Sequence, residues 1–220
     1  MPKGQAKIEL ARGCSLASVA RWLDAGLTTK LVEFFRNRHE DRFFGPIDCL
    51  MDAAQSHHGY GFSMMSVCCL LVETLQCYRE GLPTTSSIEW KELLRIQRNE
   101  SVPAQYKLPH SLPINGKQAF LRFFARYKTF FPGIDGGSFY ANIRNGLLHQ
   151  GQTKGGWTID IQGSMLCDPT SKNIHRNFFA RQLRASFNDY LGELRGCSWS
   201  DDLWIKAARK TWWLIRLSKG

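Results

Sequence analysis

The chain lacks the features of a disulfide framework, a structural zinc site or a bilayer span. Its 7 cysteines are odd in number and scattered, form no C-x-x-C, and belong to no Cys/His cluster with zinc-ligand spacing. The most apolar stretch, Met64 to Val72, is too short to cross a bilayer and soon reaches Glu73. No basic-then-apolar leader opens the sequence. We therefore expect free thiols in a reducing compartment, a cytoplasmic location and no membrane partner.

Acidic residues are also scarce. The chain has 19 Asp and Glu against 29 Lys and Arg, a formal net charge of +10, and a pI near 9.4. Such an excess favours polyanionic partners, nucleic acid before an anionic membrane surface. The alternative is a charge that serves solubility alone.

What is present is ordinary for a globular protein. With 43% hydrophobic and 22% charged residues, 220 residues suffice for one sizeable core or at most two small ones. There is no internal repeat and no low-complexity tract. We predict a single α-helical domain over residues 1–220.

Hydrophobic periodicity and Gly/Pro punctuation predict a mostly α bundle. A "GP" at Gly45–Pro46 is expected to restart the chain into a new helix, and the proline-rich segment 100–115 is expected to be an extended loop. Alternation of Trp157, Ile159 and Ile161 predicts a small β-hairpin near residues 156–167. The predicted helices cover 16–35 with a break near Gly26, 47–55, 62–79, 88–98, 116–130, 138–150, 173–194 and 202–217. In the last helix, Trp204, Trp212 and Trp213 are expected to be buried in the core. The alternative is that this basic helix binds RNA or lies on a membrane.

The segment "FYANIRNGLLHQG" places Arg144 and His149 with four residues between them. Chance alone supplies such a pair about once in a chain of this composition, so the spacing by itself proves nothing. Its helical context is more informative. A core-facing stripe is predicted at Phe139, Tyr140, Ile143 and Leu147. Arg144 then lies at one flank of that stripe, His149 well round the far side, and Asn145 and Leu148 between them. An exposed Leu148 predicts contact with a second copy of the chain.

"IRNGLLHQG" on a helix late in an α bundle, followed by a further long helix, resembles the HEPN superfamily of bacterial and archaeal toxins and defence proteins. Its ribonuclease members carry Arg, four to six residues, then His, commonly with a polar residue after the arginine, here Asn145. The resemblance implies an antiparallel HEPN-like bundle at about residues 43–195, with helical additions at both ends. One subset of that superfamily has a tyrosine two residues after the histidine, as the acceptor of nucleotide modification. Gly151 stands there in this chain, so regulation by that route is in doubt.

The resemblance also implies an activity, that of a metal-independent endoribonuclease in a toxin or antiviral defence system. Two protomers would join their motif helices, so that each site holds Arg144, Asn145 and His149 from both copies. His149 would serve as general base or acid, Arg144 would hold the phosphate, and Asn145 would orient the phosphate or the partner imidazole. RNA, a second copy and an antitoxin or regulatory protein are the implied partners, with no cofactor and no metal. Lys154, Arg176 and Arg181 are candidate RNA-binding residues.

Two other interpretations remain open. In the first, the protein is a non-catalytic bundle that binds nucleic acid or a partner protein through the same face. In the second, the protein is a metal-dependent enzyme that uses His57, His58 or His110.

Overall fold

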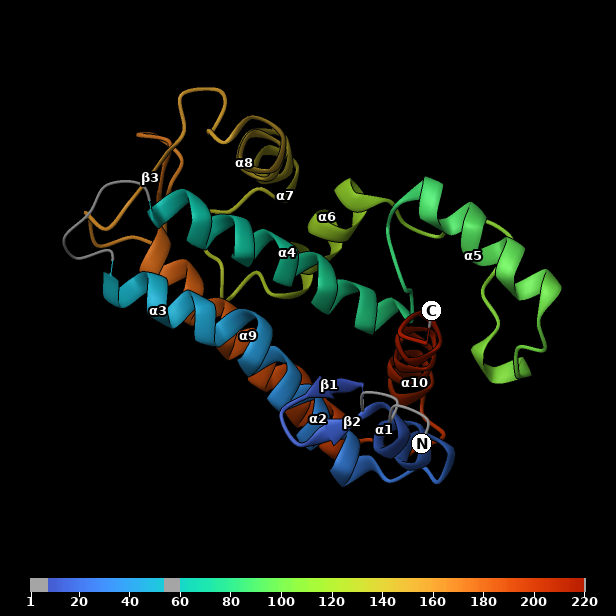
Figure 1. Ribbon diagram of the computed structural model, residues 1–220. Helices are drawn as coiled ribbons and strands as arrows, with labels where there is room; N and C mark the ends of the chain where they lie inside the picture. The colour runs from blue at the N-terminus through green and yellow to red at the C-terminus, as the bar shows by residue number, and fades with distance from the viewer. Residues whose placement is uncertain (1–7, 54–59, 220) are drawn as a thin grey trace, which may run out of the picture.

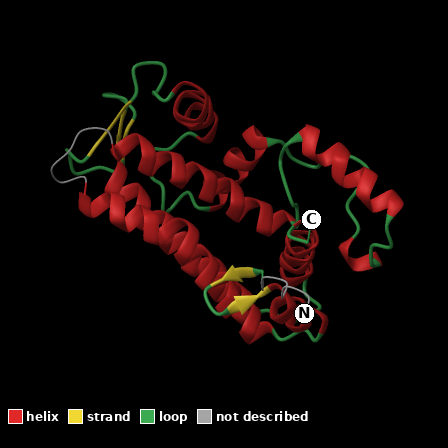
Figure 2. Cartoon of the chain, viewed as in Figure 1, coloured by secondary structure: helices red, strands yellow, loops and turns green. Residues whose placement is uncertain are grey.

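The protein folds as a mostly helical assembly with two small sheets (Figures 1 and 2). The computed structural model describes residues 8–53 and 60–219. Its larger helices are α1 (Leu16–Asp24), α2 (Thr28–His39), α3 (Gly45–Ala53), α4 (Tyr60–Glu80), α5 (Ser87–Asn99), α6 (Gly116–Arg126), α9 (Arg176–Gly196) and α10 (Asp202–Leu217). The shorter helical elements are η1 (Glu40–Phe44), η2 (Ala104–Tyr106), α7 (Gly136–Ser138), η3 (Phe139–Arg144) and α8 (Asn145–Gln150). The strands are β1 (Glu9–Ala11), β2 (Cys14–Ser15), β3 (Thr158–Asp160), β4 (Cys167–Asp168) and β5 (Asn173–His175).

Helix α4 is the centre of the fold. It packs against α3, α6, α9 and α10, because most of its side chains are apolar and no single face has to meet water. Buried residues from Leu10 to Ile215 join into one hydrophobic cluster around it. Among the described helices, α4 is also the one long and apolar enough to span a bilayer, yet 56% of its most apolar window is buried inside the fold. That is the position of a core helix.

The helix boundaries follow local signals in the sequence. Gly26 and Gly81 adopt φ of 61° and 69°, a left-handed conformation that costs glycine little and ends a helix. The side chain of Ser86 accepts the Glu89 amide and caps the start of α5. Trp204 and Trp213 of α10 are fully buried, as predicted. Trp212, also predicted to be buried, is only half-buried and stacks on Tyr106 at 5.6 Å between ring centroids.

The predicted restart at Gly45–Pro46 is wrong. α2, η1 and α3 follow one another without a break, and η1 is a π-helical turn in which the Gly45 amide bonds to the Glu40 carbonyl. A wider turn accommodates a proline that would clash with the carbonyl of a regular α-helix. The result is one long helix along the lower face of the molecule (Figure 1).

The predicted hairpin near residues 156–167 is also wrong. β3 and β4 do not pair with each other in the described sheet, whose order is β3-β5-β4. β5 lies between them, parallel to β3 and antiparallel to β4. Its central residue Ile174 is fully buried, so the start of the predicted 173–194 helix is a strand and α9 begins at Arg176.

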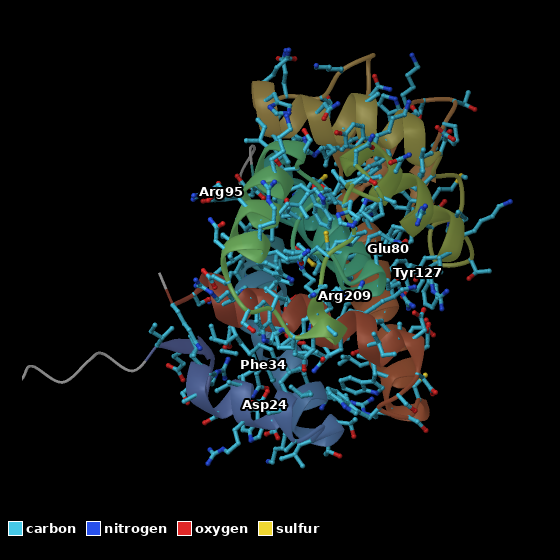
Figure 3. The ribbon with its side chains drawn as sticks, turned by 90° about the vertical axis from the view of Figure 1, so that its right-hand side faces the viewer. Asp24, Phe34, Glu80, Arg95, Tyr127 and Arg209 are labelled. Atoms are coloured by element: carbon cyan, nitrogen blue, oxygen red, sulfur yellow. The ribbon has the colours of Figure 1, made fainter. Side chains whose placement is uncertain are left out.

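A cluster of stacked rings anchors the motif helix. Phe139 stacks on Phe179 of α9 at 5.3 Å between ring centroids and packs against Phe120 and Phe124 of α6. Each of these side chains is at most 4% exposed, and burying a phenylalanine contributes about 1.5–3 kcal/mol. The motif helix is thereby fixed at the end of the molecule opposite the N-terminal helices that carry Asp24 and Phe34 (Figure 3).

Candidate active site

The motif residues lie on one continuous helix formed by α7, η3 and α8. The Asp135 side chain accepts the Ser138 amide at 2.7 Å and caps its start. η3 is a π-helical turn in which the Asn145 amide bonds to the Tyr140 carbonyl. Gly151, with φ of 66°, ends the helix, as the sequence predicts. Figure 1 shows this helix nearly end-on beside α4.

Gly146 allows the chain to fold back on the motif helix. A Cβ at position 146 would overlap the Gln152 carbonyl oxygen and touch the Thr153 backbone. The returning segment is held by the Lys154 amide, which donates to the Asn142 carbonyl at 2.8 Å. Glycine between the two motif residues is therefore a packing requirement that keeps the helix end compact.

Arg144 and His149 are in contact. Arg144 Nη1 lies 3.3 Å from His149 Nε2 and donates to Asn145 Oδ1 at 3.2 Å. The flexible arginine side chain spans the angle that separates the two positions on the helix. Because arginine can only donate, Nε2 is the acceptor, and the imidazole carries its proton on Nδ1 in this arrangement. His149 is exposed and Asn145 is half-buried, so the group faces solvent on one side.

A carboxylate on α4 completes the group. Arg144 Nη2 lies 3.4 Å from Glu73 Oε2, and the two side chains are 18% and 20% exposed. The Thr85 hydroxyl donates to the other Glu73 oxygen. A charge-assisted bond between these groups is usually about 2.7–2.9 Å, so Glu73 orients the guanidinium through a long contact.

The remaining surroundings of the guanidinium are aromatic and buried. It lies 5.4 Å from the centre of the Tyr140 ring, within cation–π range. Arg144 Nε is buried and has no hydrogen-bond partner among the described residues. One side of the guanidinium is thus held by protein, while Nη1 points toward the exposed imidazole.

The nearby thiols do not offer a nucleophile. Burial raises the pKa of Cys69 well above its ordinary value, and the same cause raises the pKa of Cys68. A nucleophilic cysteine needs a lowered pKa. The chemistry of this site therefore falls to the imidazole and the guanidinium.

The predicted RNA-binding cations do not gather in one place. Lys154 lies beside the motif helix, through its backbone bond to Asn142. Arg176 is only 7% exposed, and its side chain packs on Gly61, about 18 Å along α4 from Glu73 at 1.5 Å per residue. Arg181 is exposed on α9.

Leu148 is half-buried, less exposed than predicted. Within residues 8–53 and 60–219, no three His, Cys, Asp or Glu side chains are placed to hold a metal ion. His57 and His58 lie outside the described residues.

Glu73 and Thr85 could not be assigned to the site from their sequence neighbours. The available signal was a carboxylate in the middle of a nearly all-apolar helix, a position that a charged residue occupies only with a partner. That partner is 71 residues away in the chain.

No protein-family model, no curated protein and no solved structure matches this chain.

Proposed function

We propose that the protein is a metal-independent endoribonuclease of HEPN type that acts in the cytoplasm as a toxin or antiviral defence effector. The observation that carries the proposal is the contact between Arg144 Nη1 and His149 Nε2 at 3.3 Å on a solvent-facing surface. A net charge of +10 supports a polyanionic substrate.

The proposed reaction uses the nucleophile that RNA carries. A phosphate oxygen replaces His149 Nε2 as the acceptor of Arg144 Nη1, which frees the imidazole lone pair. Nε2 then takes the proton of the 2′-OH while the 2′ oxygen attacks phosphorus. The bond from phosphorus to the 5′ oxygen breaks, and that oxygen takes up a proton. The products are a 2′,3′-cyclic phosphate and a 5′-OH end.

The guanidinium stabilises the charge that builds on the phosphate. Arginine stays protonated and presents a planar pair of donors to two phosphate oxygens. Asn145 orients the phosphate or an imidazole. A second copy of the chain brings another Arg144 and His149 to the same cleft, and the half-buried Leu148 lies on the joining face. An antitoxin or regulatory protein would control this activity.

Cleavage of total RNA by the purified protein in EDTA tests the proposal. We expect His149→Ala and Arg144→Ala each to lower the rate by about 10²- to 10⁴-fold. Matched controls remove the same residue types elsewhere: His110→Ala and Arg95→Ala alter exposed side chains and should retain activity. End analysis should find cyclic phosphates, and light scattering should give the mass of a dimer. Cleavage that survives both motif substitutions would overturn the assignment.

The second candidate is a non-catalytic bundle that binds nucleic acid or a partner protein through this face. The contact of Arg144 with Glu73 favours it, because a guanidinium already paired inside its own chain can be structural. It predicts RNA binding without cleavage, steeply dependent on salt and unchanged by His149→Ala.

A further inference from the structure

A cavity lined by three cations lies at the junction of α2, η1, α4 and α10. The proposed reaction does not use its residues. The cavity has a volume of about 390 Å³, within the size range of small-molecule sites, about 300–1,000 Å³. Its lining residues are Arg38, Arg42, Phe43, Thr74, Tyr78, Pro83, Lys210, Leu214 and Leu217.

Three of the lining residues are cations and none is an acid. Arg38 Nη1 donates to the Leu10 carbonyl at 2.7 Å, and Arg42 Nη2 reaches the same oxygen at 3.5 Å. Lys210 Nζ donates to the carbonyls of Leu82 and Pro83, each at 3.1 Å. In the part of the chain that the structure describes, none of the three forms a salt bridge with a carboxylate. Their partners are neutral oxygens.

The carboxylates next to these cations in sequence are engaged elsewhere. Glu40 pairs with Arg184 of α9 at 2.7 Å, and Asp41 pairs with Arg12 at 2.6 Å. Both acids directly precede Arg42 in the chain, yet neither forms a salt bridge with it. The positive charge of the cavity is therefore a consequence of how the fold distributes its acids.

Lys210 is the innermost of the three cations. It is half-buried and lies 5.3 Å from the centre of the Tyr78 ring. Burial is the main cause that lowers the pKa of Lys210. The charge of Arg38 lowers this pKa further, while Cys77 opposes the shift. A partly desolvated ammonium beside another cation is stabilised when an anion joins it.

The remaining walls are apolar. Phe43 and Tyr78 present rings, and Pro83, Leu214 and Leu217 add aliphatic surface. Arg42 is followed directly by Phe43, and Lys210 lies about one helical turn from Leu214, so each helix offers a cation beside an apolar group. An anion bound to the cations would place its organic part against these walls.

We propose that this cavity binds an organic phosphate, namely a phosphate monoester that carries a small apolar or ring-shaped body. Guanidinium and ammonium groups are the side chains that bind phosphate dianions, and the rings and leucines match a compact organic group. The cavity volume suits one small molecule and not a nucleic-acid strand. This inference is independent of the proposed function.

Calorimetric titration of the full-length protein with phenyl phosphate tests the proposal. We expect saturable binding with one ligand per chain, and at least about tenfold weaker binding of inorganic phosphate, which lacks the ring. Arg42→Met and Lys210→Met should each weaken phenyl phosphate binding at least about tenfold. Arg42 is exposed, so its variant carries the test if Lys210→Met does not fold.

Two controls locate the binding. Lys206→Met removes the same charge from the same helix, but Lys206 pairs with Asp202 at 2.7 Å outside the cavity, so affinity should not change. Arg95→Met removes an exposed arginine that pairs with Glu92 at 2.7 Å outside the cavity, and it should also leave the affinity unchanged.

Three results would overturn the proposal. They are the absence of saturable binding, an equal loss in Lys206→Met, or equal affinity for phenyl phosphate and inorganic phosphate. Displacement of phenyl phosphate by an RNA oligomer with the same dependence on Arg42 would assign the cavity to a polyanion instead.

Discussion

Replacing His39 with glutamine should remove a large part of the acid sensitivity of the fold. His39 is 1% exposed, and its ring lies among Phe43, Tyr78 and Phe187, with centroids 4.6 Å from Phe187. Nδ1 lies 2.7 Å from the Phe35 carbonyl and donates to it. Nε2 is buried and has no hydrogen-bond partner among the described residues. A proton on Nε2 would therefore create a charge without solvent or counter-ion.

The magnitude follows from the shift in pKa. Burial, opposed by the Phe35 carbonyl and reinforced by Arg38 and Lys210, lowers the pKa of His39 from 6.5 to about 4. Above pH 6.5 both the folded and the unfolded chain hold a neutral imidazole, and the full stability is present. As the pH falls from 6.5 to about 4, only the unfolded chain takes up the proton, so the free energy of unfolding decreases. At about 1.4 kcal/mol per pH unit, the decrease is about 3 kcal/mol.

Urea unfolding at pH 7.5, 6, 5 and 4 measures this effect. His39→Gln keeps a donor for the Phe35 carbonyl but does not titrate. Between pH 7.5 and 4 the free energy of unfolding of the wild-type chain should fall about 3 kcal/mol further than that of the variant. His110, His149 and His175 are present in both chains and cancel in the difference. Parallel pH profiles would show that His39 is protonated in the folded state and would refute the reasoning.

Three further substitutions test other parts of the structure. Glu73→Gln should loosen the motif arginine, so that the rate at saturating RNA falls about tenfold to a hundredfold. KM should decrease, because the negative charge of Glu73 no longer repels the RNA phosphates. Equal KM in both chains would contradict a positioning role. Gly146→Ala should lower the free energy of unfolding in urea by about 1–3 kcal/mol through overlap with the returning backbone, whereas the control Gly192→Ala, which meets nothing within 4 Å, should not destabilise. Arg79→Met should cost about 1–3 kcal/mol in the same assay, because the Tyr127 hydroxyl and the Glu193 carboxylate lose a charged donor while Glu193 keeps its contact with Arg126 at 2.8 Å. A loss below about 0.5 kcal/mol would show that solvent and Arg126 replace the pair.

The helices could be predicted because their signals are local. Apolar spacing, the glycines at positions 26, 81 and 151, and the proline-rich segment after α5 mark where most of them begin and end. The π-helical turns could not be read in this way. One extra residue in a turn leaves no compositional mark, so the chain through Gly45–Pro46 was predicted to restart where it continues. The three-residue strand β5 was missed because too few residues alternate to distinguish it from a helix start.

The site could be predicted only in part. The sequence placed Arg144, Asn145 and His149 on one helix that Gly151 ends, and these positions are confirmed. It could not reveal that Arg144 reaches His149, which depends on the reach of a long side chain. It could not reveal Glu73 or Thr85 either, because their contact with the motif is created by packing of α4 against α8. The antiparallel HEPN-like bundle over residues 43–195, the dimer and the RNA substrate stay predictions.

The short turn after α4 connects the cavity that contains Lys210 with the motif site that contains Arg144. Lys210 donates to the carbonyls of Leu82 and Pro83 in this turn. Two residues further on, the Thr85 hydroxyl donates to Glu73, the carboxylate that contacts Arg144. A ligand that draws the Lys210 ammonium away from those carbonyls would loosen the turn, and with it the contact of Thr85 with Glu73 that positions the Arg144 guanidinium. Under the proposed function, occupancy of that cavity would therefore change the orientation of the arginine that is proposed to hold the RNA phosphate.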